Sequence, residues 1–129
     1  MIPLIALLLA AGDPAADFES LRSTPLAQGR WIYQPIAGGS VARFSPYVSV
    51  RCDRASGRVQ LVAPGYTKVA TDTAAVTLPP GGWFAARDRR LDAIIFSRSR
   101  VVLTGGEGRP PVAVPAEPEA ARSIEDCRN

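Results

Sequence analysis

Short runs of alternating apolar and polar residues, separated by glycine and proline, follow one another through most of the 129-residue chain. The clearest run is Val48-Ser49-Val50-Arg51-Cys52, in which a period of two places Val48, Val50 and Cys52 on one face. Such alternation is typical of β-strands with one buried face. The pattern predicts six to eight short strands, with the face of Val48, Val50 and Cys52 turned toward the core.

Glycine pairs mark where these strands reverse direction. Gly38-Gly39 lies between the strand-like runs at 30–36 and 41–44 and predicts a hairpin, because glycine adopts the backbone angles of tight turns. A second hairpin is expected between residues 101–103 and 112–114, joined by the loop at 104–111. Four large aromatic residues are expected in the core of the sheet, namely Trp31, Tyr33, Trp83 and Phe84.

Helical periodicity appears only in the C-terminal half. Asp88 can cap a helix, and Leu91, Ile94 and Ile95 recur at helical spacing behind it, which predicts a helix over about 89–96. A second helix is predicted at 117–127, where Pro118 suits the first turn. Its apolar stripe would hold Ala120, Ala121, Ile124 and Cys127. The predicted fold class is α+β, a mainly antiparallel sheet with two short helices.

The N-terminus predicts export. Residues 2–11 are apolar and uncharged, and small residues follow, as in a signal peptide with its cleavage zone. We expect a signal peptide at 1–16, cleaved after Gly12 or Ala16, a flexible lead-in at 17–29, and one domain at 30–129. The alternative is a buried N-terminal helix, since the run is too short to span a bilayer. The expected location is periplasmic or secreted.

The two cysteines agree with export. An even number of cysteines in a small exported chain predicts a disulfide, here between Cys52 and Cys127, and the alternative is two separate buried thiols. The bond would close a loop of 127 − 52 = 75 residues. Loop entropy then gives it roughly 4.5 kcal/mol of stabilisation.

The net charge of +3 comes almost entirely from arginine, because Lys68 is the only lysine. The chain lacks the dense basic stripe of a nucleic-acid-binding protein. One cluster of arginines is a candidate anion-binding face, for instance for the phosphates of envelope lipids. The alternative is an ordinary solvated surface, diluted by Asp88 and Asp92. The cluster consists of Arg87, Arg89, Arg90, Arg98 and Arg100.

The chain lacks the residues that most kinds of catalysis require. The chain has no histidine, so Ser-His-Asp catalysis and most zinc sites are excluded, and its glycines match no phosphate-binding motif. We therefore expect no cofactor and no metal. A serine mechanism through Lys68 lacks a partner motif. A carboxylate pair could hydrolyse glycosides, but the four candidates fit other roles. Glu117 and Glu119 fit the start of a helix, and Glu125 and Asp126 fit a solvent-facing chain end.

Two stretches carry a resemblance. They are L-D-A-I-I-F-S-R-S-R at 91–100 and P-A-E-P-E-A-A-R-S-I-E-D-C-R at 115–128. Together they resemble a group of small exported proteins of alphaproteobacteria that share an internal cysteine after a valine-rich strand and a C-terminal E-D-C-R. The resemblance implies a disulfide and a periplasmic location but no activity. The plan is more loosely similar to the invasion-associated locus B proteins.

These observations favour a non-catalytic binding module over an enzyme. The expected partner is an envelope protein or another envelope component, with no nucleic acid and at most a peripheral contact with the membrane. The first alternative is a periplasmic inhibitor of an envelope hydrolase, such as a lysozyme or a protease. The second is a carboxylate-dependent hydrolase of the cell wall.

Overall fold

The computed structural model describes residues 21–129. The predicted signal peptide and the first residues of the lead-in lie outside this range. The described chain folds into nine strands in two antiparallel sheets, with orders β1-β2-β3-β4-β7 and β6-β5-β8-β9. The predicted α+β class is therefore confirmed, with one strand more than the six to eight expected. The strands are β1 (Ile32–Ile36), β2 (Gly39–Phe44), β3 (Val48–Asp53), β4 (Arg58–Val62), β5 (Lys68–Ala70), β6 (Ala75–Thr77), β7 (Trp83–Ala85), β8 (Arg100–Thr104) and β9 (Val112–Pro115).

Both predicted hairpins are confirmed. β1 and β2 pair with Ile36 opposite Gly39, so only Ala37 and Gly38 form the turn, and Gly38 has a φ of 78°. Only glycine adopts such an angle without strain. Gly39 is required for a different reason: a Cβ there would lie 1.8 Å from the carbonyl oxygen of Cys52 on β3. The second hairpin joins β8 and β9, with Val101 opposite Val114.

Both predicted helices are also present. The first consists of a 3-10 turn, η2 (Arg89–Leu91), that continues into α3 (Asp92–Ile95), and the Asp88 side chain caps it by accepting a hydrogen bond from the Arg90 amide at 2.9 Å. The second is α4 (Pro118–Arg128), which has proline in its first turn. A further 3-10 turn, η1 (Pro80–Gly82), leads into β7. No helix within residues 21–129 has the length and apolar character needed to cross a membrane.

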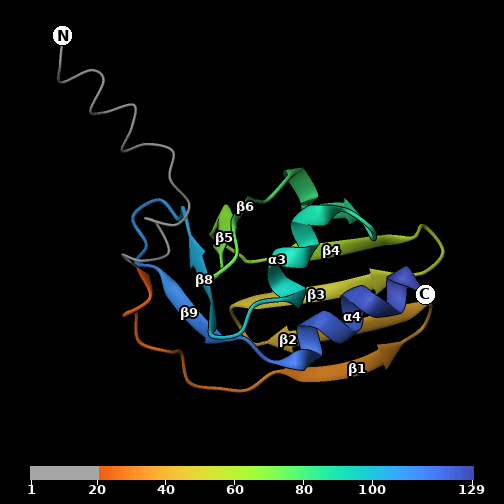
Figure 1. Ribbon diagram of the computed structural model, residues 1–129, viewed down its shortest axis with the longest axis horizontal. Helices are drawn as coiled ribbons and strands as arrows, with labels where there is room; N and C mark the ends of the chain where they lie inside the picture. The colour runs from red at the N-terminus through yellow and green to blue at the C-terminus, as the bar shows by residue number, and fades with distance from the viewer. Residues whose placement is uncertain (1–20) are drawn as a thin grey trace, which may run out of the picture.

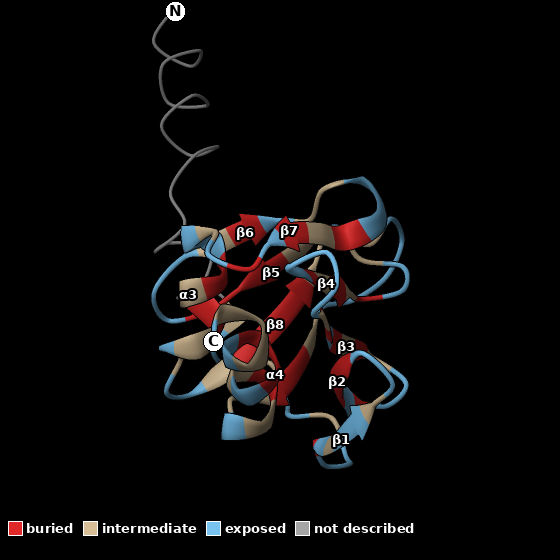
Figure 2. Ribbon diagram, turned by 90° about the vertical axis from the view of Figure 1, so that its right-hand side faces the viewer, coloured by how far each residue is buried: buried red, intermediate tan, exposed pale blue. Residues whose placement is uncertain are grey.

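The core lies between the two sheets and the helices α3 and α4. In Figure 1, α4 runs across the near side of β1, β2 and β3, and α3 lies beside it. The buried residues follow the inner faces of the elements (Figure 2). As predicted, Val48, Val50 and Cys52 face inward, and Phe44, Leu61, Leu91 and Ile124 are fully buried with them.

The predicted inward faces are correct in part. Trp31 and Phe84 are buried, whereas Tyr33 and Trp83 are only half-buried. On α4, Ala120 and Ile124 are buried as expected, but Ser123 takes the buried position expected for Ala121. The difference arises because the side of α4 that carries Cys127 contacts the sheet. Ser123 lies on that same side, four residues before Cys127.

The chain ahead of β1 lies against β9. The Ala27 amide donates to the Ala113 carbonyl at 2.8 Å, and Leu26 forms an isolated parallel bridge with Ala113. The Arg100 guanidinium donates to the carbonyl of Thr24. Residues 24–27 thus cover part of the outer edge of β9.

Candidate functional site

A disulfide joins the C-terminal helix to the five-stranded sheet, as predicted. The sulfurs of Cys52 on β3 and Cys127 on α4 are bonded, with 5.5 Å between their Cα atoms. The bond connects two elements whose cysteines are 75 residues apart in sequence. It fixes the end of α4 over the sheet and leaves no free cysteine in the described chain.

A polar cluster lies beside the disulfide, under α4. The Asp126 carboxylate accepts hydrogen bonds from the Tyr33 hydroxyl at 2.5 Å and from the Ser40 hydroxyl at 2.7 Å. The Ser40 hydroxyl also lies 3.3 Å from that of Ser123, and both serines are fully buried. The prediction that Asp126 faces solvent is correct only in part. The side chain is half-buried and supplies the acceptor that the hydroxyls of Tyr33 and Ser40 need.

The environment of Asp126 keeps it ionised. Partial burial acts to raise the pKa of the carboxyl group, but the hydrogen bonds from Tyr33 and Ser40 and the nearby charges of Arg54 and Arg122 outweigh it. The net result is a pKa below the ordinary value of an aspartate. The Arg122 guanidinium also stacks on the Tyr33 ring, 3.9 Å from its centroid. Asp126 thus acts as a charged acceptor that holds α4 to β1 and β2.

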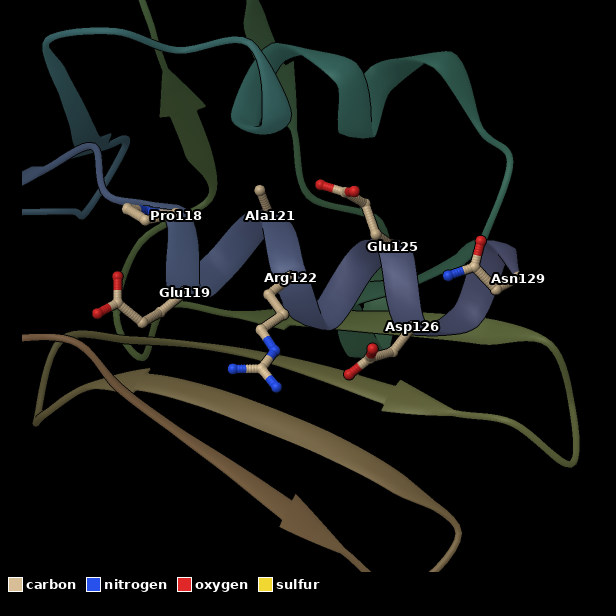
Figure 3. Close-up of a pocket in the computed structure, with 7 residues that line it drawn as sticks. All are labelled: Pro118, Glu119, Ala121, Arg122, Glu125, Asp126 and Asn129. Carbon is tan, nitrogen blue, oxygen red and sulfur yellow. The ribbon is translucent and has the colours of Figure 1, made fainter.

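The other candidate carboxylates do not join Asp126 in a facing pair. Figure 3 shows Glu125 and Asp126 leaving α4 on opposite sides, with Asp126 directed toward the strands. Glu119 lies a helix turn or more away in the first turn, and Glu117 is the exposed residue that precedes the helix. Glycoside hydrolysis needs two carboxyl groups that face each other across a bound sugar. The four side chains do not form that arrangement.

The predicted arginine cluster is divided among several places. Arg87 and Arg90 bind within the molecule: the Arg87 guanidinium donates to the Arg128 carbonyl at 2.6 Å, and Arg90 pairs with Asp88 at 2.7 Å. These hydrogen bonds from Arg90 lower the pKa of Asp88. Arg128 pairs with Asp92 at 2.9 Å. These hydrogen bonds and ion pairs hold the C-terminal end of α4 against the segment that contains η2.

The remaining three arginines of the predicted cluster lie apart from this network. Arg100 is half-buried in β8 and holds Thr24, and Arg98 is exposed in the turn after α3, where its amide donates to Asp72 at 3.2 Å. Arg89 is exposed at the start of η2. Of the five side chains, Arg89 and Arg90 therefore lie together beside a surface groove.

This groove lies between β6 and the segment of η2 and α3. It has a volume of about 380 Å³ and a mainly apolar lining. Phe96 at the end of α3 is 61% exposed at the groove, the highest exposure of any large apolar side chain in the described range. The β6 groove, as we call it, is lined by Thr73, Ala74, Ala75, Val76, Arg89, Arg90, Asp92, Ala93 and Phe96.

The backbone of β6 offers free hydrogen-bonding groups along this groove. The Thr71 amide donates to Ala74, and the Leu78 amide donates to Thr67, so every second residue of β6 is bonded to β5. In an antiparallel pair the residues between them direct their N–H and C=O groups the other way. Those residues are Ala75 and Thr77. Within residues 21–129, β6 is the edge strand of its sheet and no strand pairs with that side.

Sequence reasoning placed Phe96 at the end of a helix and did not predict its exposure. The signal was the run Ile94-Ile95-Phe96, because three consecutive apolar residues cannot all face inward from a helix of 3.6 residues per turn. Ile94 is buried, Ile95 is half-buried, and Phe96 is left outside. That β6 forms a sheet edge followed from no local pattern.

No protein-family model, curated protein or solved structure matches the chain. Within residues 21–129, no group of three or more histidine, cysteine, aspartate or glutamate side chains is placed to hold a metal ion.

Proposed function

We propose that this protein is a non-catalytic binding module that holds an extended segment of a partner protein in the β6 groove. The free edge of β6 supports this function: Ala75 and Thr77 direct their N–H and C=O groups away from β5, and Ala75 lines the same groove as the exposed ring of Phe96. Exposed strand edges next to apolar grooves bind peptides by strand addition.

The groove also indicates the chemistry of the bound segment. An added strand would form main-chain hydrogen bonds with Ala75 and Thr77 and place alternate side chains against Phe96 and the small residues Ala74 and Ala93. Those side chains would be apolar. Arg89 is exposed at the same groove and forms no ion pair within the described chain, so an acidic residue would follow at that end.

We propose that this binding takes place outside the cytoplasm, in the periplasm or after secretion. The disulfide supports this location, because such bonds persist in oxidising compartments. The apolar N-terminal run and the resemblance to exported proteins support it as well. Intact mass spectrometry of protein made with its own leader tests it, since export predicts loss of the first 12 to 16 residues and of two hydrogens.

Selection from a displayed library of random octapeptides tests the function. We expect enriched peptides to carry an apolar residue near an acidic one. The Phe96→Ser and Arg89→Gln variants should weaken binding of a selected peptide, measured by fluorescence anisotropy. Ile32→Ser is the matched control for Phe96, since Ile32 is also exposed but lies on β1.

Strand addition has its own test. In an added strand, only every second amide of the peptide faces β6. N-methylation of that set of amides in a selected peptide should abolish binding, and N-methylation of the other set should leave it unchanged. Ala75→Pro removes one outward N–H without removing a bond to β5, and proline is tolerated at sheet edges. If the selected peptides bind wild type, Phe96→Ser and Ala75→Pro equally well, or if no peptide is enriched, the proposal is wrong.

A further inference from the structure

One face of the five-stranded sheet packs against α4. On the opposite face, which we call the open face, the central Val41 is only 2% exposed, whereas the arginines around it are exposed. The side chains of Tyr33, Ser40 and Cys52 point toward α4, which they contact through Asp126 and Cys127. Because successive side chains alternate across a sheet, their neighbours in sequence point the other way. Figure 2 shows β1 to β4 nearly end-on, with α4 on one side of them and no described helix on the other.

The open face is basic. It carries Arg43 on β2, Arg51 on β3 and Arg58 on β4, all exposed. Asp53, the single acidic residue in these five strands, lies on the same face opposite Arg58. Within the described chain no acidic side chain forms an ion pair with Arg43 or Arg51. Arg58 stacks on Trp83 of β7, with its guanidinium 4.9 Å from the ring centroid.

Strand register places the three arginines in a diagonal row. Arg43 lies opposite Ser49, two residues from Arg51 on the same strand. Arg51 lies opposite Gln60, two residues from Arg58. With about 4.8 Å between strands and about 3.4 Å per residue, neighbouring Cα atoms in the row are roughly 8 Å apart. A single small anion could therefore contact only one or two of these side chains.

Apolar side chains border the row. Ile32 on β1 is 54% exposed, and Trp83 on β7 is half-buried beneath Arg58. Arginine and tryptophan, with an exposed aliphatic residue, are the side chains that combine at membrane interfaces, where the charge meets phosphate and the apolar part meets the acyl boundary. The sheet presents them over several strands, so one extended anionic surface can reach all of them at once.

We infer that the open face of the five-stranded sheet docks the protein reversibly on an anionic phospholipid surface. The inference is independent of peptide binding, because the β6 groove lies on other elements. Docking uses the three arginines together with Ile32 and Trp83 on a rigid sheet, and it inserts no segment of the chain into the bilayer.

Co-sedimentation with vesicles tests the inference. Wild type should sediment with vesicles of 30% phosphatidylglycerol in phosphatidylcholine and remain in solution with pure phosphatidylcholine. Binding should be lost in 0.5 M salt, because ionic screening shortens the reach of exposed charges. Replacing Arg51 with glutamine should lower the partition coefficient by about fivefold, and the double variant Arg43→Gln/Arg51→Gln by about 25-fold.

Arg98→Gln is the matched control, since it removes the same charge from an exposed position outside the sheet. It should leave the partition coefficient within twofold of wild type. An intact oxidised mass and an unchanged far-ultraviolet circular dichroism spectrum establish that each variant is folded. The inference fails if wild type does not bind the anionic vesicles, if binding survives high salt, or if Arg98→Gln matches the loss in Arg51→Gln. If this face binds an acidic protein and does not bind vesicles, its partner is a protein and the inference of lipid docking is wrong.

Discussion

The polar cluster of Asp126, Tyr33, Ser40 and Ser123 under α4, which we call the seam, and the β6 groove present their hydrogen-bonding groups in opposite ways. In the seam, the Asp126 carboxylate meets two hydroxyl donors, and a disulfide lies next to it. At the groove, the outward backbone groups of β6, the ring of Phe96 and the guanidinium of Arg89 face solvent. The seam is internally complete, whereas the groove presents groups that another molecule could satisfy.

This difference separates polar residues that hold the fold from residues available for binding. A polar group buried without a partner costs free energy, so the satisfied hydroxyls and carboxylate of the seam are explained by stability alone. An exposed strand edge and a large exposed aromatic ring contribute little to the stability of the isolated chain. Changes in the seam should therefore affect unfolding, and changes in the groove should affect binding.

The largest expected effect is on the disulfide. Replacing both Cys52 and Cys127 with alanine should lower the free energy of unfolding by about 4 kcal/mol, since the bond closes a loop of 75 residues. Urea unfolding of the variant, compared with oxidised and with reduced wild type, measures the loss. Equal free energies of unfolding for the variant, oxidised wild type and reduced wild type would show that the disulfide does not stabilise the fold.

The second effect concerns Asp126. Asp126→Asn should lower the free energy of unfolding at neutral pH by about 2 kcal/mol, because two hydrogen bonds to a charged acceptor are weakened. The pKa of the folded carboxyl group is depressed, so its contribution is complete above its unfolded pKa of about 3.9 and is lost as the pH falls through the folded value. Unfolding curves from pH 7 to pH 2 should converge for the two proteins. A constant difference across this range would contradict the role of the charge.

The third effect is on amide exchange. The outward amides of Ala75 and Thr77 should exchange with deuterium at least about tenfold faster than the amide of Val76, which is bonded to β5. The amides in the centre of β2 and β3 should be the slowest. Exchange measured by nuclear magnetic resonance checks both statements, and a bound peptide should slow Ala75 and Thr77 specifically. Strong protection of these amides in the free protein would mean that the edge is covered.

The smallest effect on stability is expected at Phe96. Phe96→Ser should change the free energy of unfolding by less than about 0.5 kcal/mol, because a ring that is 61% exposed loses little buried area. Leu91→Ala is the contrast, since a fully buried leucine in η2 should cost about 3 kcal/mol. Thermal unfolding of the two variants measures the difference. A large loss for Phe96→Ser would place the ring in the fold rather than in a binding surface.

Local patterns were sufficient for most of the elements. The alternation around Val50, the turn at Gly38, the cap at Asp88 and the proline in the first turn of α4 each predicted the observed structure, because their causes act within a few residues. The same patterns could not place Asp126 or Arg100, since their hydrogen-bond partners, Tyr33 and Thr24, are 93 and 76 residues away in sequence. They also could not divide the strands into two sheets.

The sequence by itself determined the α+β class, both hairpins and both helices, because backbone geometry and the burial of apolar faces are local. It also determined the pairing of the two cysteines, because the chain has only two. Tertiary structure alone decided which strands became edges, which arginines bind within the molecule, and which face of the five-stranded sheet lacks a cover. Those outcomes depend on strand order and on the packing of α4, where residues far apart in sequence compete for the same donors and acceptors. The β6 groove arises where η2 and α3 lie beside β6, and the row of Arg43, Arg51 and Arg58 arises from the register of β2, β3 and β4.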